Sequence, residues 1–421
     1  MQKPKLLIWA DPPVHEDGSL FCTGHGKILY NILPILQKQF STMQIGISLS
    51  AKQYQYKGHH ITNIVSNDRD YWGFETFNAI VGNADKANKP DIVLTITDCL
   101  GDGNNYSRHF QQYITQSGIP YVSWIAMAEN SFDHGYVDFV MSCNHLIGMA
   151  DYTKVITLEE LPFLEKKITT LYPPVSSCFK KPIGDERNKL REEFDWGDKK
   201  VLLLVSKNQK RKNIPIYFEL IKRLPAEYHL MMIVSSVRKS SNNPNVFDGW
   251  NLESLHRSAY ADLGSRININ NGKYVELYGM PDEELAKYYK AADATLLLSG
   301  NEGLGVPVLE SMACGTPSVV SQFGPLQELA ADDRGMIVNT ERFDFSLGAT
   351  PRLSTVPGLD DAAIKIREVC ENSDKSKLLS ENGLKFIEMI NDESRLSSIN
   401  DILMDAYETR NHVVIEPDMV L

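Results

Sequence analysis

The chain has 421 residues, of which 43% are hydrophobic and 23% are charged, and its formal net charge is −11. A chain of this length holds two domains of roughly 150–200 residues each. The acidic balance argues against a general affinity for DNA or for anionic membranes, although a local basic patch keeps a nucleic-acid partner open.

The six cysteines stand apart from one another and form no CxxC pair. Scattered cysteines of this kind are typical of reduced thiols in an intracellular protein. The first apolar stretch, at 6–10, is too short for the core of a signal peptide, and no apolar run is long enough to span a bilayer. We therefore expect a soluble cytoplasmic protein without a transmembrane segment, and leave open a peripheral attachment to a membrane.

Short apolar runs alternate with longer amphipathic stretches through the N-terminal half, which is typical of parallel βαβ units. The strand-like runs of this half are 5–10, 44–50, 59–65, 91–98, 120–127, 138–144, 154–158 and 168–175. The helical stretches are 27–40, 75–88 and 105–117. The polar segment 176–194 follows two prolines and is the expected connection between domains.

A second alternating series begins at residue 199. Its expected strands are 199–206, 228–237, 274–279, 295–299, 317–321 and 335–339, and its expected helices are 213–224, 282–294 and 306–315. The polar stretch 239–272 is long for a connection and is expected to hold a helix near 251–262. The pattern predicts an α/β protein of two Rossmann-like α/β/α domains facing across a cleft, with ligands at the carboxyl ends of the strands.

The most informative segment, SGNEGLGVPVLESMACGTPSVVS at 299–321, contains a strand end, a glycine loop and a helix. Gly303 and Gly305 let the backbone approach a ligand closely and take dihedral angles that are closed to other residues. Pro307 suits the first turn of a helix, and Gly315 suits its C-terminal stop. A loop of this kind presents amide groups and the positive end of a helix dipole to one point, where a phosphate binds readily.

This segment resembles the signature of family 4 of the retaining glycosyltransferases, in which two glutamates are separated by seven residues, here Glu302 and Glu310. The resemblance extends over roughly 199–340. It implies the GT-B fold and places Glu302 at the donor-sugar hydroxyls and Glu310 at the ribose. The donor-binding residues that it implies are Glu310, Gly303, Leu304, Gly305, Gly279 and Tyr278.

A basic cluster, SKNQKRKN at 206–213, follows the strand that opens the second half. Cations at the carboxyl end of a strand can neutralise a leaving diphosphate, which is the main electrostatic demand of glycosyl transfer. The family pattern has an arginine followed five residues later by a lysine, and these positions hold Lys207 and Lys212. With Glu302, the resemblance makes these two lysines the catalytic candidates. A solvated basic turn is the alternative interpretation.

The first loop of the chain, at 11–27, contains Gly24, His25 and Gly26, which resemble the family's glycine turn near the donor phosphates and the acceptor. Many relatives have a histidine after the strand at 120–127, where this chain has Ala126 followed by Glu129. These four residues, Gly24, His25, Gly26 and Glu129, are the acceptor-side candidates. Asp98, at the end of a predicted strand, suits either a site residue or a helix N-cap.

The resemblance implies three parts of the chain. Residues 1–178 form an acceptor-binding domain, 179–385 form a nucleotide-sugar-binding domain, and 386–421 form a helix that crosses back to the N-terminal domain, plus a tail. It implies retention of the anomeric bond by a same-face substitution. No essential metal and no cofactor are expected, because the nucleotide sugar is a substrate. The expected acceptor is a glycan, a lipid-linked glycan or a small molecule.

Three other functions compete with this interpretation. A dinucleotide-dependent oxidoreductase would share the Rossmann-like halves, but no GxGxxG follows the first strand. A sugar-nucleotide-binding module without turnover is the second, and a transferase acting on modified DNA is the third. Donor binding without turnover would favour the module, and a cofactor-dependent absorbance change would favour the oxidoreductase.

Overall fold

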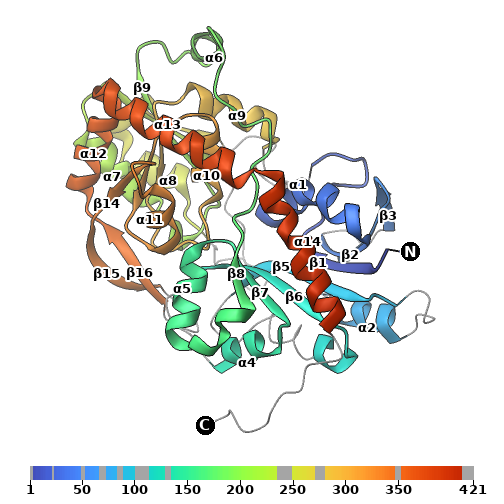
Figure 1. Cartoon of the computed structure of the whole chain (residues 1–421). Helices are drawn as coiled ribbons and strands as arrows, with labels where there is room; N and C mark the ends of the chain where they lie inside the picture. Colours follow the sequence, from blue (N-terminus) through green and yellow to red (C-terminus); the bar gives the residue numbers. More distant parts are fainter. Residues whose placement is uncertain are drawn as a thin grey trace. The chain divides into compact units, whose positions relative to one another are not determined.

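The computed structural model describes residues 3–20, 23–48, 53–65, 73–82, 89–99, 113–128, 134–234, 249–270, 280–346 and 352–409. The chain divides into two compact units (Figure 1). Unit 1 comprises residues 1–127, 131–173 and 392–421, and unit 2 comprises 128–130 and 174–391. The sequence places the corresponding limits after residues 178 and 385, whereas the units divide after residues 173 and 391.

Unit 1 is built on a sheet of eight strands in the order β3-β4-β2-β1-β5-β6-β7-β8, parallel except for β3. The strands are β1 (Lys5–Ala10), β2 (Ser41–Ser48), β3 (Gln53–Tyr56), β4 (His59–Val65), β5 (Ile92–Cys99), β6 (Tyr121–Met127), β7 (His145–Gly148) and β8 (Ile168–Thr170). The helices include α1 (Gly24–Gln39), α2 (Phe74–Gly82), α4 (His134–Ser142), α5 (Asp151–Glu160), η1 (Pro162–Lys167) and α14 (Glu393–Glu408). Every residue of β6 is buried, as expected for a parallel strand covered on both faces.

The C-terminal helix α14 belongs to unit 1 although it follows unit 2 in the chain. It packs against α1, β5 and β6. Leu396, Ile399 and Leu403 are buried on one face, at the three- and four-residue spacing of an amphipathic helix. The Asn400 side-chain amide donates to the backbone oxygen of Ile35 in α1 over 2.9 Å. Residues 393–408 therefore complete the unit that the N-terminus begins.

Unit 2 contains a six-stranded, wholly parallel sheet in the order β11-β10-β9-β12-β13-β14. The strands are β9 (Lys200–Ser206), β10 (Tyr228–Val234), β11 (Ile267–Asn270), β12 (Ala294–Leu297), β13 (Ser318–Ser321) and β14 (Met336–Val338). The helices are α6 (Glu186–Glu193), η2 (Lys210–Lys212), α7 (Pro215–Arg223), α8 (Leu252–Ala259), η3 (Ala261–Arg266), α9 (Asp282–Ala291), α10 (Val306–Ala313), α11 (Gly324–Ala330), α12 (Leu359–Glu371) and α13 (Ser373–Ile390). The predicted α/β class and Rossmann-like sheets are confirmed.

Two predicted strands of the N-terminal half are wrong. Residues 138–144 lie mostly in α4, and 154–158 lie in α5. A short apolar run does not by itself distinguish a strand from a helix. A longer stretch of the sequence indicates a helix, because the buried side chains Tyr136, Phe139 and Val140 are spaced at the helical period.

Two further features differ from the prediction. The connection at 176–194 is helical in its second part, where α6 forms. An antiparallel hairpin of β15 (Thr340–Ser346) and β16 (Arg352–Pro357) follows β14 and was not expected (Figure 1). The predicted strand at 274–279 lies outside the described residues.

Candidate active site

The loops that carry the candidate residues of unit 2 follow two neighbouring strands. β9 lies between β10 and β12, so the strand order reverses at this point of the sheet. Adjacent parallel strands bring their carboxyl ends to the same edge, and ligands bind outside such a switch point. The basic loop at 207–213 follows β9, and the glycine loop at 298–305 follows β12. The backbone N–H of Gly300 joins them by donating to the Arg211 carbonyl oxygen over 2.8 Å.

Glu302 lies in the glycine loop at this edge of the sheet, and only 5% of the residue is exposed. Its carboxylate forms an ion pair and hydrogen bond with the Lys212 ammonium, which is also buried. The Arg211 guanidinium lies 3.2 Å from the second carboxylate oxygen. The Ser299 hydroxyl donates to the first oxygen over 2.7 Å. Burial alone would be costly for this charge, and the two cations and the hydroxyl compensate for it.

The same contacts control the protonation of Glu302. Burial by itself raises the pKa of the carboxyl, but the Lys212 and Arg211 charges and the hydrogen bonds from Lys212 and Ser299 outweigh it and lower the pKa to about 2. Glu302 is therefore a carboxylate at neutral pH. It is a hydrogen-bond acceptor there and not a proton donor.

At Gly305 and Pro307 the glycine loop has the geometry that the sequence predicts. Gly305 has φ of +99°, and a Cβ atom there would lie 2.6 Å from Cδ2 of Leu326, so no other residue fits without strain. Gly305 is the N-cap of α10, and Pro307 lies in its first turn. The positive end of the helix dipole therefore lies beside Glu302, next to Gly303 and Leu304.

Gly300 is fixed from the other side by the unexpected hairpin. Its carbonyl oxygen accepts from the backbone N–H of Thr355 in β16 over 2.9 Å. A Cβ atom at Gly300 would lie 1.9 Å from the Ser354 hydroxyl oxygen. The hairpin thus supports the start of the loop that carries Glu302.

Glu310, in α10, is 3% exposed. Its carboxylate accepts a hydrogen bond over 2.8 Å from the hydroxyl of Tyr289, a buried residue of α9. Glu302 and Glu310 therefore lie in one loop–helix segment and have different partners. Tyr278 and Gly279, predicted to line the base, lie outside the described residues.

The structure separates the two lysines of the basic cluster. Lys212 is paired with Glu302, whereas Lys207 is exposed at the end of β9. Arg211 supplies the second cation at Glu302, and the sequence pattern alone did not single it out. The signal available was its place in the basic run 210–212, directly before Lys212.

The candidates of unit 1 gather at the corresponding edge of its own sheet, where β1 lies between β2 and β5. Nε2 of His25 lies 3.4 Å from a carboxylate oxygen of Asp98, at the end of β5. Nδ1 of His25 lies 4.0 Å from Asp11, which directly follows β1. The Thr23 hydroxyl caps α1 by accepting from the N–H of Gly26 over 3.1 Å. Gly24 is the exposed first residue of that helix, and Glu129 lies outside the described residues.

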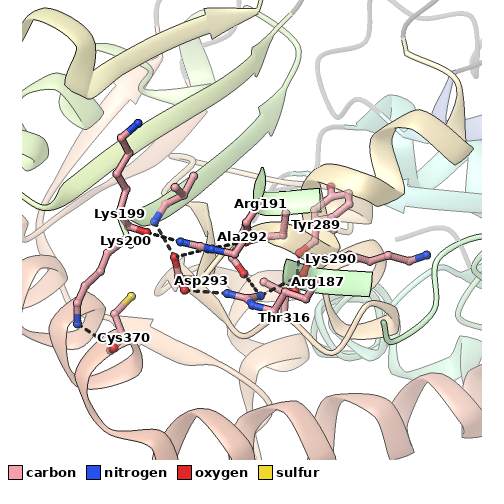
Figure 2. A network of polar contacts seen from close by, with 12 residues as sticks. Arg187, Arg191, Lys199, Lys200, Tyr289, Lys290, Ala292, Asp293, Thr316 and Cys370 are labelled. Atoms are coloured by element: carbon pink, nitrogen blue, oxygen red, sulfur yellow. Dashed lines mark hydrogen bonds and ion pairs between the residues drawn. The ribbon is translucent and has the colours of Figure 1, made fainter. Parts of the chain in front are cut away.

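The connection that leads into unit 2 is held by a polar network (Figure 2). The guanidinium groups of Arg187 and Arg191 in α6 point at the carboxylate of Asp293, at 2.8 and 3.1 Å (Figure 2). Asp293 also accepts from the backbone N–H of Val201 over 2.7 Å. Arg187 donates to the carbonyl oxygens of Lys290 and Ala292, at the end of α9. The network therefore fixes α6 to the helix that carries Tyr289.

Metal-binding clusters and membrane-spanning helices are both absent from the described residues. No group of three or more His, Cys, Asp or Glu side chains in these ranges is arranged to hold a metal ion. Among the helices that the structure describes, none combines the length and the apolar character needed to cross a membrane.

Comparison with known proteins adds family information for unit 2. Residues 186–345 match the family described as "Glycosyl transferases group 1". A D-inositol 3-phosphate glycosyltransferase of Kribbella flavida is 32% identical over 105 residues, which are 24% of each chain. The corresponding protein of Streptosporangium roseum is 48% identical over 52 residues, 12% of each chain. The alignments thus span a quarter or less of these relatives.

Solved structures match over nearly the whole chain. HepE of Anabaena, crystallised with UDP and glucose, has a TM-score of 0.67 at 13% identity, covering 96% of this chain and 100% of that one. WaaG, a glycosyltransferase involved in lipopolysaccharide biosynthesis, has a TM-score of 0.63 at 14% identity, covering 95% and 99%. The chain therefore has the GT-B fold, and its residues 186–345 match the model of the glycosyl transferases group 1 family.

Proposed function

We propose that the protein is a glycosyltransferase that moves a hexose-type sugar from a UDP- or GDP-linked donor to a hydroxyl group of a glycan acceptor. One observation carries this proposal. The buried Glu302 carboxylate, paired with Lys212 and Arg211, lies beside the glycine loop at the start of α10. Glu310, the second glutamate of the segment, is buried in the same helix.

The charges of this edge suit a nucleoside diphosphate. Breaking the bond between the sugar and the diphosphate places negative charge on the leaving phosphate. Lys212, Arg211 and Lys207 supply cations, and the start of α10 supplies a positive dipole end. We assign these groups to the diphosphate, with the backbone of Gly303, Leu304 and Gly305.

The remaining donor contacts follow from the two glutamates. Glu302 is ionised and accepts hydrogen bonds, so we assign it to hydroxyls of the donor sugar. We assign Glu310 to the ribose and the backbone of Tyr278 and Gly279 to the base. HepE, which shares the fold, was crystallised with UDP and glucose, and this supports a UDP-sugar as the first donor to test.

We propose a same-face substitution with retention at the anomeric carbon. The bond from that carbon to the diphosphate oxygen breaks, and the bond to the acceptor oxygen forms on the same face. The proton of the acceptor hydroxyl passes to the departing phosphate oxygen, so atoms and charge balance. In this mechanism the cations of unit 2 stabilise the leaving group, and neither a metal ion nor a cofactor is required.

We assign the binding of the acceptor to unit 1. Gly24, His25 and Gly26 form the first turn of α1, and Asp98 places a carboxylate next to the imidazole. Glu129 completes the proposed set. A glycan, a lipid-linked glycan or a small molecule would offer the hydroxyl group, and modified DNA is the alternative acceptor.

The test is a thermal-shift and hydrolysis screen with UDP-, GDP- and ADP-sugars on the wild type and on Glu310→Ala. We expect one donor to stabilise the wild type, to lose this effect in the variant, and to be hydrolysed slowly. NMR of the released or transferred sugar would report the anomeric configuration, and retention is expected. The rate of donor hydrolysis should be unchanged in excess EDTA.

Four results would contradict parts of the proposal. A stabilising donor that is never hydrolysed or transferred would favour a binding module without turnover. Inversion of the anomeric carbon would exclude the same-face mechanism, and loss of the rate in EDTA would exclude metal independence. The absence of any shift with every nucleotide sugar would remove the donor assignment itself.

A further inference from the structure

The contact between Tyr289 and Glu310 is a hydrogen bond from a phenol to a carboxylate inside unit 2. Tyr289 has no measurable exposure and Glu310 has 3%. The Tyr289 hydroxyl lies 2.8 Å from Oε2 of Glu310. A hydrogen bond to an ionised group in a buried site is among the stronger ones in proteins, so this contact restrains the carboxylate.

Tyr289 is itself held at several points. Its ring packs edge-on against Phe179, with the centroids 5.9 Å apart and the planes at 76°. Its carbonyl oxygen accepts from the Thr316 hydroxyl over 2.6 Å, and Figure 2 shows this contact. Arg187 binds the carbonyl oxygens of Lys290 and Ala292 just beyond it. The phenol therefore has a fixed direction, set by groups outside α10.

The phenol acts as a hydrogen-bond donor at any ordinary pH. Burial, together with the neighbouring Glu310 charge, raises the pKa of Tyr289 well above its usual range. The last torsion of a glutamate side chain is broad and poorly restrained by its own sterics. Fixing one carboxylate oxygen therefore also fixes the direction of the other.

We propose that Tyr289 is a positioning residue that orients the Glu310 carboxylate toward a ribose hydroxyl, so that unit 2 selects ribonucleoside diphosphates over deoxyribonucleoside diphosphates. The inference rests on the proposed function, which assigns Glu310 to the ribose. It adds that the selection depends on the hydroxyl of a residue that does not itself touch the ligand.

The experiment compares the affinities of UDP and 2′,3′-dideoxy-UDP by calorimetry, with the GDP and ADP pairs in parallel. The wild type should prefer the ribonucleotide by about tenfold or more, the value of one hydrogen bond to a charged group. Tyr289→Phe should reduce the preference to less than about threefold. The loss should lie in ribonucleotide binding, with dideoxynucleotide affinity unchanged.

Tyr228→Phe is the matched control. Tyr228 is also a buried tyrosine of unit 2, and its hydroxyl donates to Oε1 of Glu371 over 2.9 Å. This variant loses one tyrosine hydrogen bond to a carboxylate, as Tyr289→Phe does, and should keep the wild-type preference for ribose. If Tyr289 had only a structural role, Tyr289→Phe would likewise lower the melting temperature without changing the preference for ribose.

Glu310→Gln provides a second test that does not depend on the folding of the tyrosine variant. If the Tyr289 hydroxyl occupies the single amide oxygen, the glutamine presents its NH₂ group to the ribose. That group can only donate to a hydroxyl oxygen, so a neutral hydrogen bond replaces the charge-assisted one and the preference falls. If the glutamine can rotate freely, it offers its oxygen and keeps the preference.

The outcomes separate this inference from the proposed function. A wild type that binds both nucleotides equally, or neither, contradicts the assignment of Glu310 to the ribose. A wild type with the expected preference, together with an unchanged preference in Tyr289→Phe or in Glu310→Gln, overturns the role of Tyr289 alone.

Discussion

The Lys212 ammonium and the Glu302 carboxylate form a buried ion pair between residues 90 positions apart in the sequence. Lys212 comes from the loop after β9 and Glu302 from the loop after β12, so the pair joins the two sides of the switch point. The pair makes the stability of this edge sensitive to either partner.

Replacing Lys212 by Met should destabilise unit 2 strongly. Removing one partner leaves the other charge buried and incompletely compensated, which costs about 3–5 kcal/mol. Arg211 and Ser299 remain as partners of Glu302, so we expect the loss of stability to lie at the lower end of this range. Urea denaturation would measure it, and the double variant Lys212→Met with Glu302→Gln should recover part of the loss. A double variant as unstable as the sum of the singles would show that the two residues are not coupled.

The stability of unit 2 should also depend on pH through Glu302. The pKa of this carboxyl is about 2 in the folded protein, against an ordinary value of 4.5. A lowered folded pKa contributes stability that is present above about pH 4.5 and is lost as the pH falls toward 2. The contribution is roughly 3 kcal/mol, since one pKa unit is about 1.4 kcal/mol.

The measurement is the free energy of unfolding from pH 6 to pH 2 for the wild type and Glu302→Gln. The wild type should lose stability more steeply in this range, because the variant lacks the titrating group. Parallel curves for the two proteins would contradict the lowered pKa.

Gly305→Ala should destabilise the glycine loop and weaken donor binding. The backbone has φ of +99°, and the new methyl group would lie 2.6 Å from Cδ2 of Leu326. Strain of this kind costs on the order of 1–3 kcal/mol. Gly82→Ala is the control, because Gly82 ends α2 without a positive φ, and a methyl group added there would meet no atom within 4 Å. Thermal unfolding should separate the two variants, and equal melting temperatures would exclude strain at Gly305.

Asp293→Asn should loosen the attachment of α6 to unit 2. The Asp293 carboxylate accepts from Arg187, Arg191 and the backbone of Val201, and the amide of asparagine reproduces only part of this pattern (Figure 2). We expect a loss of about 1–3 kcal/mol in the free energy of unfolding.

The exposed helical pair Arg367–Glu371 offers a matched comparison for this network. Arg367→Ala should cost less than about 0.5 kcal/mol, because solvent screens such pairs. Hydrogen exchange should show faster opening of α6 in Asp293→Asn than in Arg367→Ala. Equal protection of α6 in the two variants would mean that the Asp293 network does not hold this helix.

Local sequence patterns were enough to predict the α/β class, most of the parallel strands and the segment that carries Glu302 and Glu310. These features are local, because the hydrophobic period, the glycine loops and the helix stops each depend on residues that are close together in the chain. The same locality explains the errors at α4 and α5, because the apolar runs 138–144 and 154–158 are too short to distinguish a helical period from a strand.

Which charged side chains meet depends on the order of the strands in the sheet. The sequence offered several cations after β9, and the neighbouring positions of β9 and β12 selected Lys212 and Arg211 for Glu302 and left Lys207 exposed. Tyr289 became a partner of Glu310, and Asp98 a neighbour of His25, for the same reason. Strand order brings together residues far apart in the chain, and the hydrophobic pattern of a strand does not specify its neighbours in the sheet.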